Sequence, residues 1–325
     1  MAEDEKNPDD AAGRSESNEA PIAVPTAEQL SELDPLEALQ ALGKPEDTAA
    51  DPNASEQVAN PAETPPSAPQ PPQAVTGPYI AFAQVSKSFG DLEVLENVSF
   101  FVNSGETLCI LGRSGVGKSV SLQMLMGFLK PDSGGITVAG DDITGYTEKQ
   151  MQKLRRKVTM VFQNGALFDS ISVGENVAFP LRERGDLYED QIQQVVKGML
   201  EMVGVAGMED LLPSDLSTGM KRSVAIARAL ASQPEAILYD EPTTMVDPLM
   251  AHLLGDLIQR LKHQLHLTSI VVTHDMRLAK KVADRVVFLH EAGARFFGTM
   301  DEMERSDDPI LRQFLELDAL LPPGQ

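Results

Sequence analysis

The stretch Gly112-Arg113-Ser114-Gly115-Val116-Gly117-Lys118-Ser119 constrains the fold of this chain more than any other. It follows the apolar run 107–111 and precedes the apolar run 120–129, and this strand, loop and helix order turns a G-x-x-x-x-G-K-S pattern into a phosphate-site prediction. Glycines let backbone N–H groups point inward, and the N-terminal end of a helix adds partial positive charge. Lys118 can then reach the β- and γ-phosphates of a nucleotide, and the Ser119 hydroxyl can hold Mg²⁺. An ordinary glycine-rich turn does not account for these two side chains.

The charge of the chain is uneven, and this excludes some functions. The net charge of the 325 residues is -22, but residues 1–78 alone hold 16 acidic and 3 basic residues, together with 13 of the 22 prolines and no aromatic residue. We therefore expect a disordered, acidic, Pro-rich extension over 1–77. The acidic balance argues against a nucleic-acid partner, because nucleic-acid binding needs a basic face. One cysteine excludes an intrachain disulfide and fits a reducing compartment, and no apolar run is long enough to span a membrane.

From residue 78 onward, predicted strands alternate with predicted helices. Strands are expected at 79–85, 94–102, 136–140, 158–162, 236–241, 269–273 and 286–290, with a turn at 86–90 and helices at 120–129, 148–157, 188–203, 221–231 and 309–320. Alternation of this kind predicts an α/β fold with a mostly parallel core sheet that is covered on both faces. The early strands predict an antiparallel β part, and residues from about 164 to 220 read as an inserted α-helical subdomain. We expect a main domain at 78–300 and a helical tail at 301–325.

Six motifs occur in an order that identifies a family. After the glycine loop come Gln163 at the end of a strand, Leu216-Ser217-Thr218-Gly219-Met220, an apolar strand that ends in Asp240 and Glu241, Val246-Asp247-Pro248, and Thr273-His274-Asp275. Together they resemble the P-loop ATPase of ABC transporters over roughly residues 79 to 300. Each motif except the loop is weak alone, but the ordered set is specific.

The resemblance implies a role for each of these side chains. ATP would lie on the loop residues Gly112, Ser114, Gly115, Gly117, Lys118, Ser119 and Val120. Mg²⁺ would be held by Ser119, Gln163 and Asp240. Glu241 resembles the general base, and His274 resembles the residue that contacts the γ-phosphate. Phe89 resembles the aromatic residue that stacks on adenine, although core packing is an alternative role for it.

The remaining motif residues imply a dimer. In the family, the counterparts of Ser217 and Gly219 complete the nucleotide site of a second copy, and Asp247 contacts that copy. One glycine loop and one signature sequence per chain therefore predict a head-to-tail homodimer around two ATP molecules. Thr218 stands where the family commonly has glycine, and its branched side chain argues against a positive-φ conformation there. Because Ser217 and Gly219 remain, we expect activity to survive.

The predicted helical insertion also indicates a subfamily. Residues 162–170 and 173–183 resemble the ATPase of Mla/Mce-type phospholipid transporters, and Met220 points the same way. That resemblance implies a peripheral position on the cytoplasmic face of the inner membrane. It also implies a membrane permease that docks near the helical subdomain, a periplasmic lipid-binding Mce-type component, and a small cytoplasmic regulator as a further candidate partner. The alternatives are another transported substrate, such as a polar amino acid or an exported lipoprotein, or a soluble ABC-type remodelling or assembly factor.

Overall fold

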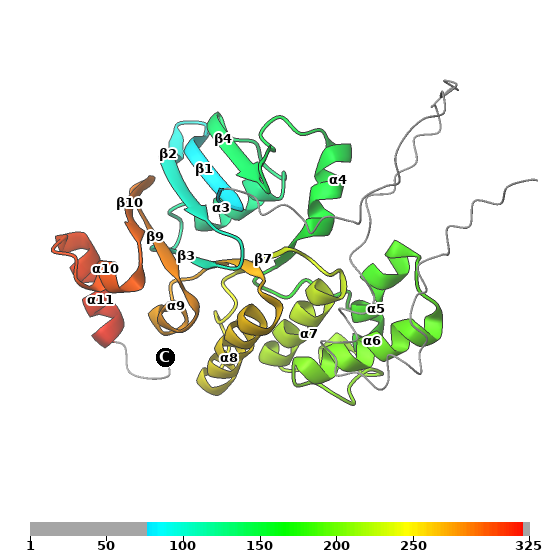
Figure 1. The fold of residues 1–325 in the computed structure, drawn as a ribbon. Helices are drawn as coiled ribbons and strands as arrows, with labels where there is room; N and C mark the ends of the chain where they lie inside the picture. Colours follow the sequence, from blue (N-terminus) through cyan, green and yellow to red (C-terminus); the bar gives the residue numbers. More distant parts are fainter. Residues whose placement is uncertain (1–76, 321–325) are drawn as a thin grey trace, which may run out of the picture.

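The computed structural model describes residues 77–320, which form two sheets with helices packed around them (Figure 1). The predicted acidic extension, 1–77, lies outside the described residues except for Gly77, and so do residues 321–325.

The central element is a six-stranded sheet in the order β10-β9-β3-β8-β7-β6. Its strands are β3 (Thr107–Leu111), β6 (Val158–Val161), β7 (Ala236–Asp240), β8 (Thr268–Val272), β9 (Arg285–His290) and β10 (Gly293–Gly298). Five strands run parallel, and only β10 pairs antiparallel, at the edge of the sheet beside β9. Because the parallel strands share one direction, their carboxyl ends meet along one edge of the sheet, where the predicted site residues follow.

A second, antiparallel sheet covers one face of the first. It has the order β2-β1-β4-β5 and consists of β1 (Ile80–Phe89), β2 (Leu92–Val102), β4 (Ser133–Val138) and β5 (Asp141–Asp142). The longer helices are α3 (Lys118–Leu125), α4 (Glu148–Lys157), α5 (Val173–Arg184), α6 (Glu189–Met202), α7 (Thr218–Ala231), α8 (Pro248–Leu265), α9 (Met276–Val282) and α11 (Pro309–Leu320). Two short ones are α10 (Met300–Glu304) and the 3-10 turn η1 (Pro213–Asp215).

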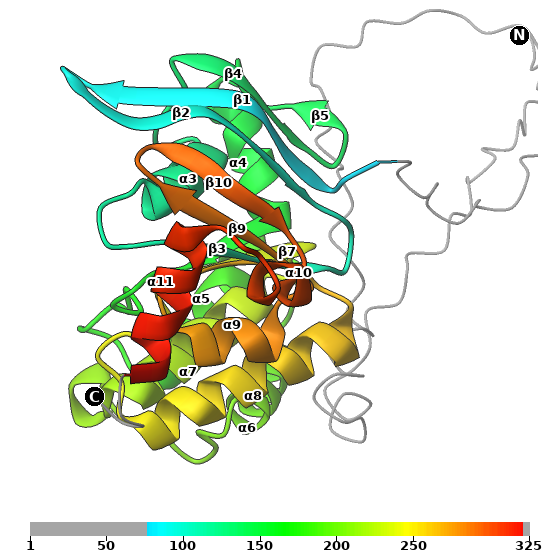
Figure 2. The same cartoon turned by 90° about the vertical axis from the view of Figure 1, so that its left-hand side faces the viewer.

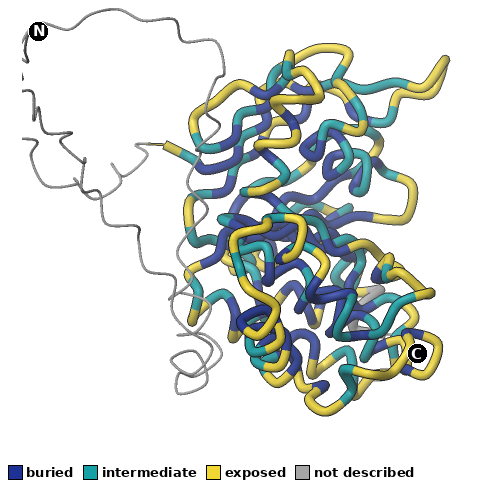
Figure 3. Tube along the Cα trace, turned by 90° about the vertical axis from the view of Figure 1, so that its right-hand side faces the viewer, coloured by how far each residue is buried: buried dark blue, intermediate teal, exposed yellow. Residues whose placement is uncertain are grey.

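The two faces of β3 belong to different cores. Leu108 and Ile110 pack with the antiparallel sheet and α3, whereas Cys109 and Leu111 pack with the helices on the other face. The layers are antiparallel sheet, core sheet and helices (Figure 2), and the buried positions run through the strands and the inner sides of the helices (Figure 3). Since β3 is covered on both sides, all five of its residues are buried, as the unbroken apolar run predicts.

The predicted fold class is confirmed, and several elements differ in extent. The helix predicted at 148–157 has those limits, and that at 188–203 lies between its caps Tyr188 and Val203. The turn predicted at 86–90 is wrong, because β1 continues to Phe89 by pairing with β2, and the turn is at Gly90 and Asp91. The helix after the loop starts and ends earlier than predicted, at Lys118–Leu125. Strand β10 and helix α10 were not predicted; β10 is short and bounded by glycines, and it forms by adding to the edge of β9.

Candidate nucleotide-binding site

The glycine loop joins β3 to α3 and encloses its own lysine. Gly117 caps α3 with a left-handed backbone, φ 97°, and Lys118 is the first residue of the helix. The Lys118 side chain is buried, and its Nζ donates to the carbonyl oxygens of Gly112 at 2.9 Å and Arg113 at 3.1 Å. The loop therefore presents a cation and a helix N-terminus at one point, which is the arrangement that favours bound phosphate.

Several side-chain oxygens that could bind a metal ion lie next to the loop. The Ser119 hydroxyl donates to Asp240 Oδ1 at 2.8 Å, and Asp240 is the last residue of β7. Burial raises the pKa of the Asp240 carboxyl and the adjacent Glu241 charge adds to it, while the Ser119 hydrogen bond opposes the shift. A cation at this point would offset the cost of the buried charge. Hydroxyl, carboxylate and the amide of Gln163 are oxygen ligands of the kind that Mg²⁺ prefers. Among residues 77–320 no group of three or more histidine, cysteine or acidic side chains forms a metal cluster, so a metal here would depend on this mixed set.

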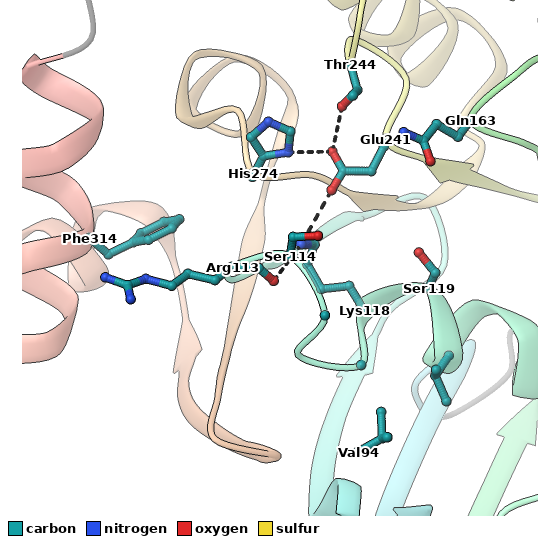
Figure 4. A pocket seen from close by; sticks show the side chains of 13 residues that line it. Val94, Arg113, Ser114, Lys118, Ser119, Gln163, Glu241, Thr244, His274 and Phe314 are labelled. Atoms are coloured by element: carbon teal, nitrogen blue, oxygen red, sulfur yellow. Dashed lines mark hydrogen bonds and ion pairs between the residues drawn. The ribbon is translucent and has the colours of Figure 1, made fainter. Parts of the chain in front are cut away.

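Glu241 is held by three neighbours directly after β7. Its Oε1 lies 3.4 Å from Lys118 Nζ, and its Oε2 accepts from Thr244 Oγ1 at 2.9 Å and lies 2.8 Å from His274 Nδ1 (Figure 4). Burial raises the pKa of the Glu241 carboxyl, but His274 and Lys118 outweigh it, and the net pKa is below its ordinary value. The hydrogen bond to Glu241 raises the pKa of the His274 imidazole. The glutamate is thus kept as a carboxylate, which is the form that a general base requires.

A cavity of about 610 Å³ unites most of the predicted residues. Its lining includes nine of them: Ser114, Gly115, Gly117, Lys118, Ser119, Val120, Gln163, Glu241 and His274. Val94, Arg113, Thr244 and Phe314 also line it and were not predicted. Gly112 and Asp240 do not line it but bond directly to residues that do. Phe89 does not line the cavity either: it is 47% exposed near the tip of the β1–β2 hairpin, with Lys87 Nζ 5.6 Å from its ring centroid.

The three residues predicted to act on a second copy lie elsewhere in the chain. Ser217 and Asp247 cap the N-termini of α7 and α8, where their side chains accept from Met220 N and Met250 N. Gly219 faces Met250 so closely that an added Cβ would lie 2.9 Å from its side chain. None of the three lines the cavity of its own chain. In one copy, the site therefore lacks the residues that the family resemblance assigns to it.

The backbone at position 218 is ordinary, as the branched side chain of threonine predicts. Thr218 is the first residue of α7 and is absent from the non-glycine residues with positive φ. An ordinary helical backbone accepts a branched side chain, so position 218 does not need a glycine.

Two buried polar residues that hold this region were missed by sequence reasoning. Arg222 donates to three carbonyls of the segment that follows β7, and Asn176 bonds Phe168 N and O and thereby ties down the loop after Gln163. Both sit inside helices whose sequences read as ordinary amphipathic patterns, so no local signal marks either one.

A second cavity, of about 690 Å³, lies between the core and the helices α5 and α7. Its lining combines exposed aromatic rings with several basic side chains: Phe128, Phe162, Phe168, Phe179, Arg155, Arg156, Arg184 and Arg228. Exposed apolar groups gathered in this way make the surface a candidate for binding a partner. No helix among residues 77–320 is long and apolar enough to cross a bilayer.

Comparison with known proteins agrees with this geometry. A profile of the family described as ABC transporter matches residues 95–244. The "Intermembrane phospholipid transport system ATP-binding protein MlaF" of Haemophilus influenzae is 40% identical over 227 residues, which is 70% of this chain and 86% of that protein. The "Probable ribonucleotide transport ATP-binding protein mkl" of Mycobacterium leprae is 37% identical over 248 residues, covering 76% of this chain and 72% of the relative.

Solved structures give the same result. A dimeric ATP-binding cassette in a post-hydrolysis state, bound to ADP and Pi, is 28% identical with a TM-score of 0.63, and the match covers 68% of this chain and 98% of that one. The cassette cbiO1 of Clostridium perfringens, part of an ABC transporter complex, is 30% identical with a TM-score of 0.65, over 74% and 96% of the two chains. The chain therefore belongs to the ABC transporter family, as an ATP-binding subunit that hydrolyses ATP to drive transport.

Proposed function

We propose that two copies of this chain bind Mg–ATP between them and drive a separate permease that moves phospholipids or related lipids between envelope membranes. One observation supports the nucleotide site. Lys118, Gln163, Glu241 and His274 line the same cavity, at the N-terminus of α3.

In this proposal the residues have separate tasks. The loop amides and Lys118 bind the phosphates, and Phe89 stacks on the adenine. Ser119, Asp240 and Gln163 hold Mg²⁺, which when bound neutralises phosphate charge and orients the phosphates.

The chemistry then centres on Glu241. Its carboxylate accepts a proton from the attacking water. His274 Nδ1 lies 2.8 Å from that carboxylate and holds it in place. Because His274 also lines the cavity, it can reach the γ-phosphate. Lys118 Nζ lies 3.4 Å from Glu241 Oε1. A bound phosphate competes for Lys118, so binding frees the carboxylate for the water while the lysine stabilises the charge on the phosphoryl group.

The second copy would complete the site. Ser217 and Gly219 lie outside the cavity of their own chain, and Asp247 is exposed beside two strongly exposed apolar residues, Met245 (85%) and Leu249 (68%). An exposed apolar surface beside the unused signature residues is suited to cover by a symmetric partner. Hydrolysis would reopen the dimer and move the permease.

The aromatic and basic second cavity is our candidate docking surface for the permease. It lies against α5, in the helical subdomain that we place at about 164–220 within a main domain at 78–300, and against α7, which starts where that subdomain ends. A helix or loop of the permease with apolar and acidic side chains would complement its rings and arginines. In this proposal the chain is a peripheral subunit on the cytoplasmic face of the inner membrane. A periplasmic lipid-binding Mce-type component would connect through the permease, and a small cytoplasmic regulator is a further candidate partner.

The phospholipid assignment is supported by the relative named for intermembrane phospholipid transport, at 40% identity. Relatives named for probable ribonucleotide transport are nearly as similar, at 37%. One experiment distinguishes phospholipid transport from ribonucleotide transport. The complex is purified from membranes of its host, and the co-purified permease and any bound lipid are identified. Enriched phospholipid supports the proposal, whereas a permease that binds nucleotides, amino acids or lipoproteins contradicts it.

The nucleotide site is tested by Glu241→Gln and Lys118→Ala. With Mg–ATP, Glu241→Gln should double in mass in sedimentation because it binds but does not hydrolyse ATP, and Lys118→Ala should remain a monomer. Full ATPase activity in Glu241→Gln would remove Glu241 as the base.

A further inference from the structure

Arg222 is an enclosed cation whose partners are all backbone oxygens of one segment. It lies on α7 and is 3% exposed. Its guanidinium donates from Nη1 to Glu241 O at 2.9 Å and Pro242 O at 2.8 Å, and from Nη2 to Thr244 O at 2.9 Å. A planar guanidinium can span three carbonyls in this way, whereas a lysine ammonium binds as a single point.

The segment held by Arg222 has an unfavourable backbone. Glu241 has φ 48° and Met245 has φ 61°, so both are non-glycine residues in the left-handed region. Residues with a Cβ occupy this region only where their surroundings hold them. The backbone bond from Glu241 N to Val272 O, at 2.9 Å, fixes the start of the segment to the sheet. Within the segment, Thr243 Oγ1 donates to Asp275 Oδ2 at 3.1 Å, and Arg222 restrains the segment through the carbonyls of three residues.

The restraint acts on the proposed catalytic carboxylate. The Glu241 side chain leaves the same backbone whose carbonyl Arg222 holds, and Thr244, the last residue of the clamp, donates its hydroxyl to Glu241 Oε2. Release of the clamp would let this backbone relax from its left-handed conformation and shift the carboxylate relative to Lys118 and His274. The helix that supplies Arg222 also begins with Ser217 and Gly219, so it connects the signature end of α7 to the carboxylate.

We infer that Arg222 is a positioning residue for ATP hydrolysis, which sets the place of Glu241 without touching the nucleotide. This inference rests on the proposed role of Glu241 as general base.

The test compares four full-length variants with wild type in steady-state ATPase assays, ADP titrations and thermal melts. Arg222→Gln should lower kcat by about 100-fold, because a displacement of about 1 Å at the reacting groups has that effect. Its ADP affinity should stay within about twofold of wild type, since the loop that binds phosphate is not held by Arg222. Arg222→Lys should restore part of kcat, because an ammonium can bond some of the carbonyls.

Lys262→Met is the matched control. Lys262 is also an enclosed cation, 13% exposed, and its Nζ bonds Val282 O at 3.1 Å and Asp284 at 2.7 Å. Asp284 accepts from Thr107 N at the start of β3, at the end of the sheet opposite the cavity. Lys262→Met should therefore lower the melting temperature and leave kcat near wild type.

Three results overturn the inference. One is a kcat for Arg222→Gln within about twofold of wild type. Another is a loss of kcat that follows the loss of melting temperature equally in Arg222→Gln and Lys262→Met. If Arg222→Gln does not fold, Arg222→Lys decides, and a wild-type kcat in that variant contradicts the inference.

Glu241→Gln distinguishes failure of the proposed general base from failure of the proposed role of Arg222. Full activity in Glu241→Gln refutes the proposed function itself. An inactive Glu241→Gln beside an active Arg222→Gln refutes only the positioning role.

Discussion

Two glycines of the phosphate loop differ in what surrounds them, and this predicts different costs for the same substitution. Both have left-handed backbones, with φ +97° at Gly117 and +85° at Gly115. A Cβ at Gly117 would lie 2.7 Å from the carbonyl oxygen of Val94 and 2.7 Å from Leu95 Cδ2, whereas a Cβ at Gly115 would meet nothing within 4 Å. Gly117→Ala therefore adds a collision with strand β2 to the backbone strain, and Gly115→Ala adds strain alone.

The magnitudes follow from these distances. A left-handed alanine costs about 1–2 kcal/mol at either position. The reduced freedom of the unfolded chain returns about 0.4–1 kcal/mol in both variants and cancels in the comparison. The collision at Gly117 involves a backbone oxygen that can move only with β2, and overpacking of this kind costs about 1–3 kcal/mol. We expect the free energy of unfolding to fall by about 1–3 kcal/mol more for Gly117→Ala than for Gly115→Ala.

Urea denaturation of the nucleotide-free protein measures this difference. The chain has no tryptophan, so the transition is best followed by circular dichroism. If the unfolding free energy depends on urea concentration with the same slope in both variants, a difference between their midpoints is a difference in stability. Equal losses, or a larger loss for Gly115→Ala, would refute the claim that β2 packs directly against the loop.

Three further predictions concern the pair beside the loop and the helices. His274→Gln should destabilise the nucleotide-free protein most between the lowered pKa of Glu241 and the raised pKa of His274. The difference should shrink as the pH rises through the His274 pKa and as it falls through the Glu241 pKa, in urea titrations from about pH 4 to about pH 9; a constant difference contradicts the ion pair. Thr218→Gly should leave kcat within about twofold of wild type, because Thr218 already has ordinary backbone, and a large gain would contradict this. Met199→Ala removes a fully buried side chain between α6 and its neighbours and should cost about 2–5 kcal/mol in denaturation, so an unchanged midpoint would refute this packing.

The sequence predicted those features whose signals are local. The glycine loop between two apolar runs predicts its own conformation and also the strand and the helix that flank it. The family resemblance assigned Asp240 and Ser119 to one Mg²⁺ site, and in the structure the two side chains are hydrogen-bonded.

Features that depend on tertiary contacts were not predictable in the same way. The clamp formed by Arg222 joins residues about twenty positions apart, and nothing in the amphipathic pattern of α7 distinguishes this arginine from a solvated one. Phe314 reaches the cavity only because α11 packs on Phe288 of β9, with ring centroids 4.8 Å apart. Strand β10 exists because β9 offers it a free edge.

The central claim, that each ATP site is shared between two copies, is tested most directly by mixing two inactive variants. Lys118→Ala disables the loop but retains the signature, whereas Ser217→Arg disables the signature but retains the loop. A mixed dimer contains one site with both parts intact, so the mixture should regain ATPase activity, up to about a quarter of wild type if copies pair at random in a symmetric dimer. A mixture that stays as inactive as its two components would contradict the claim.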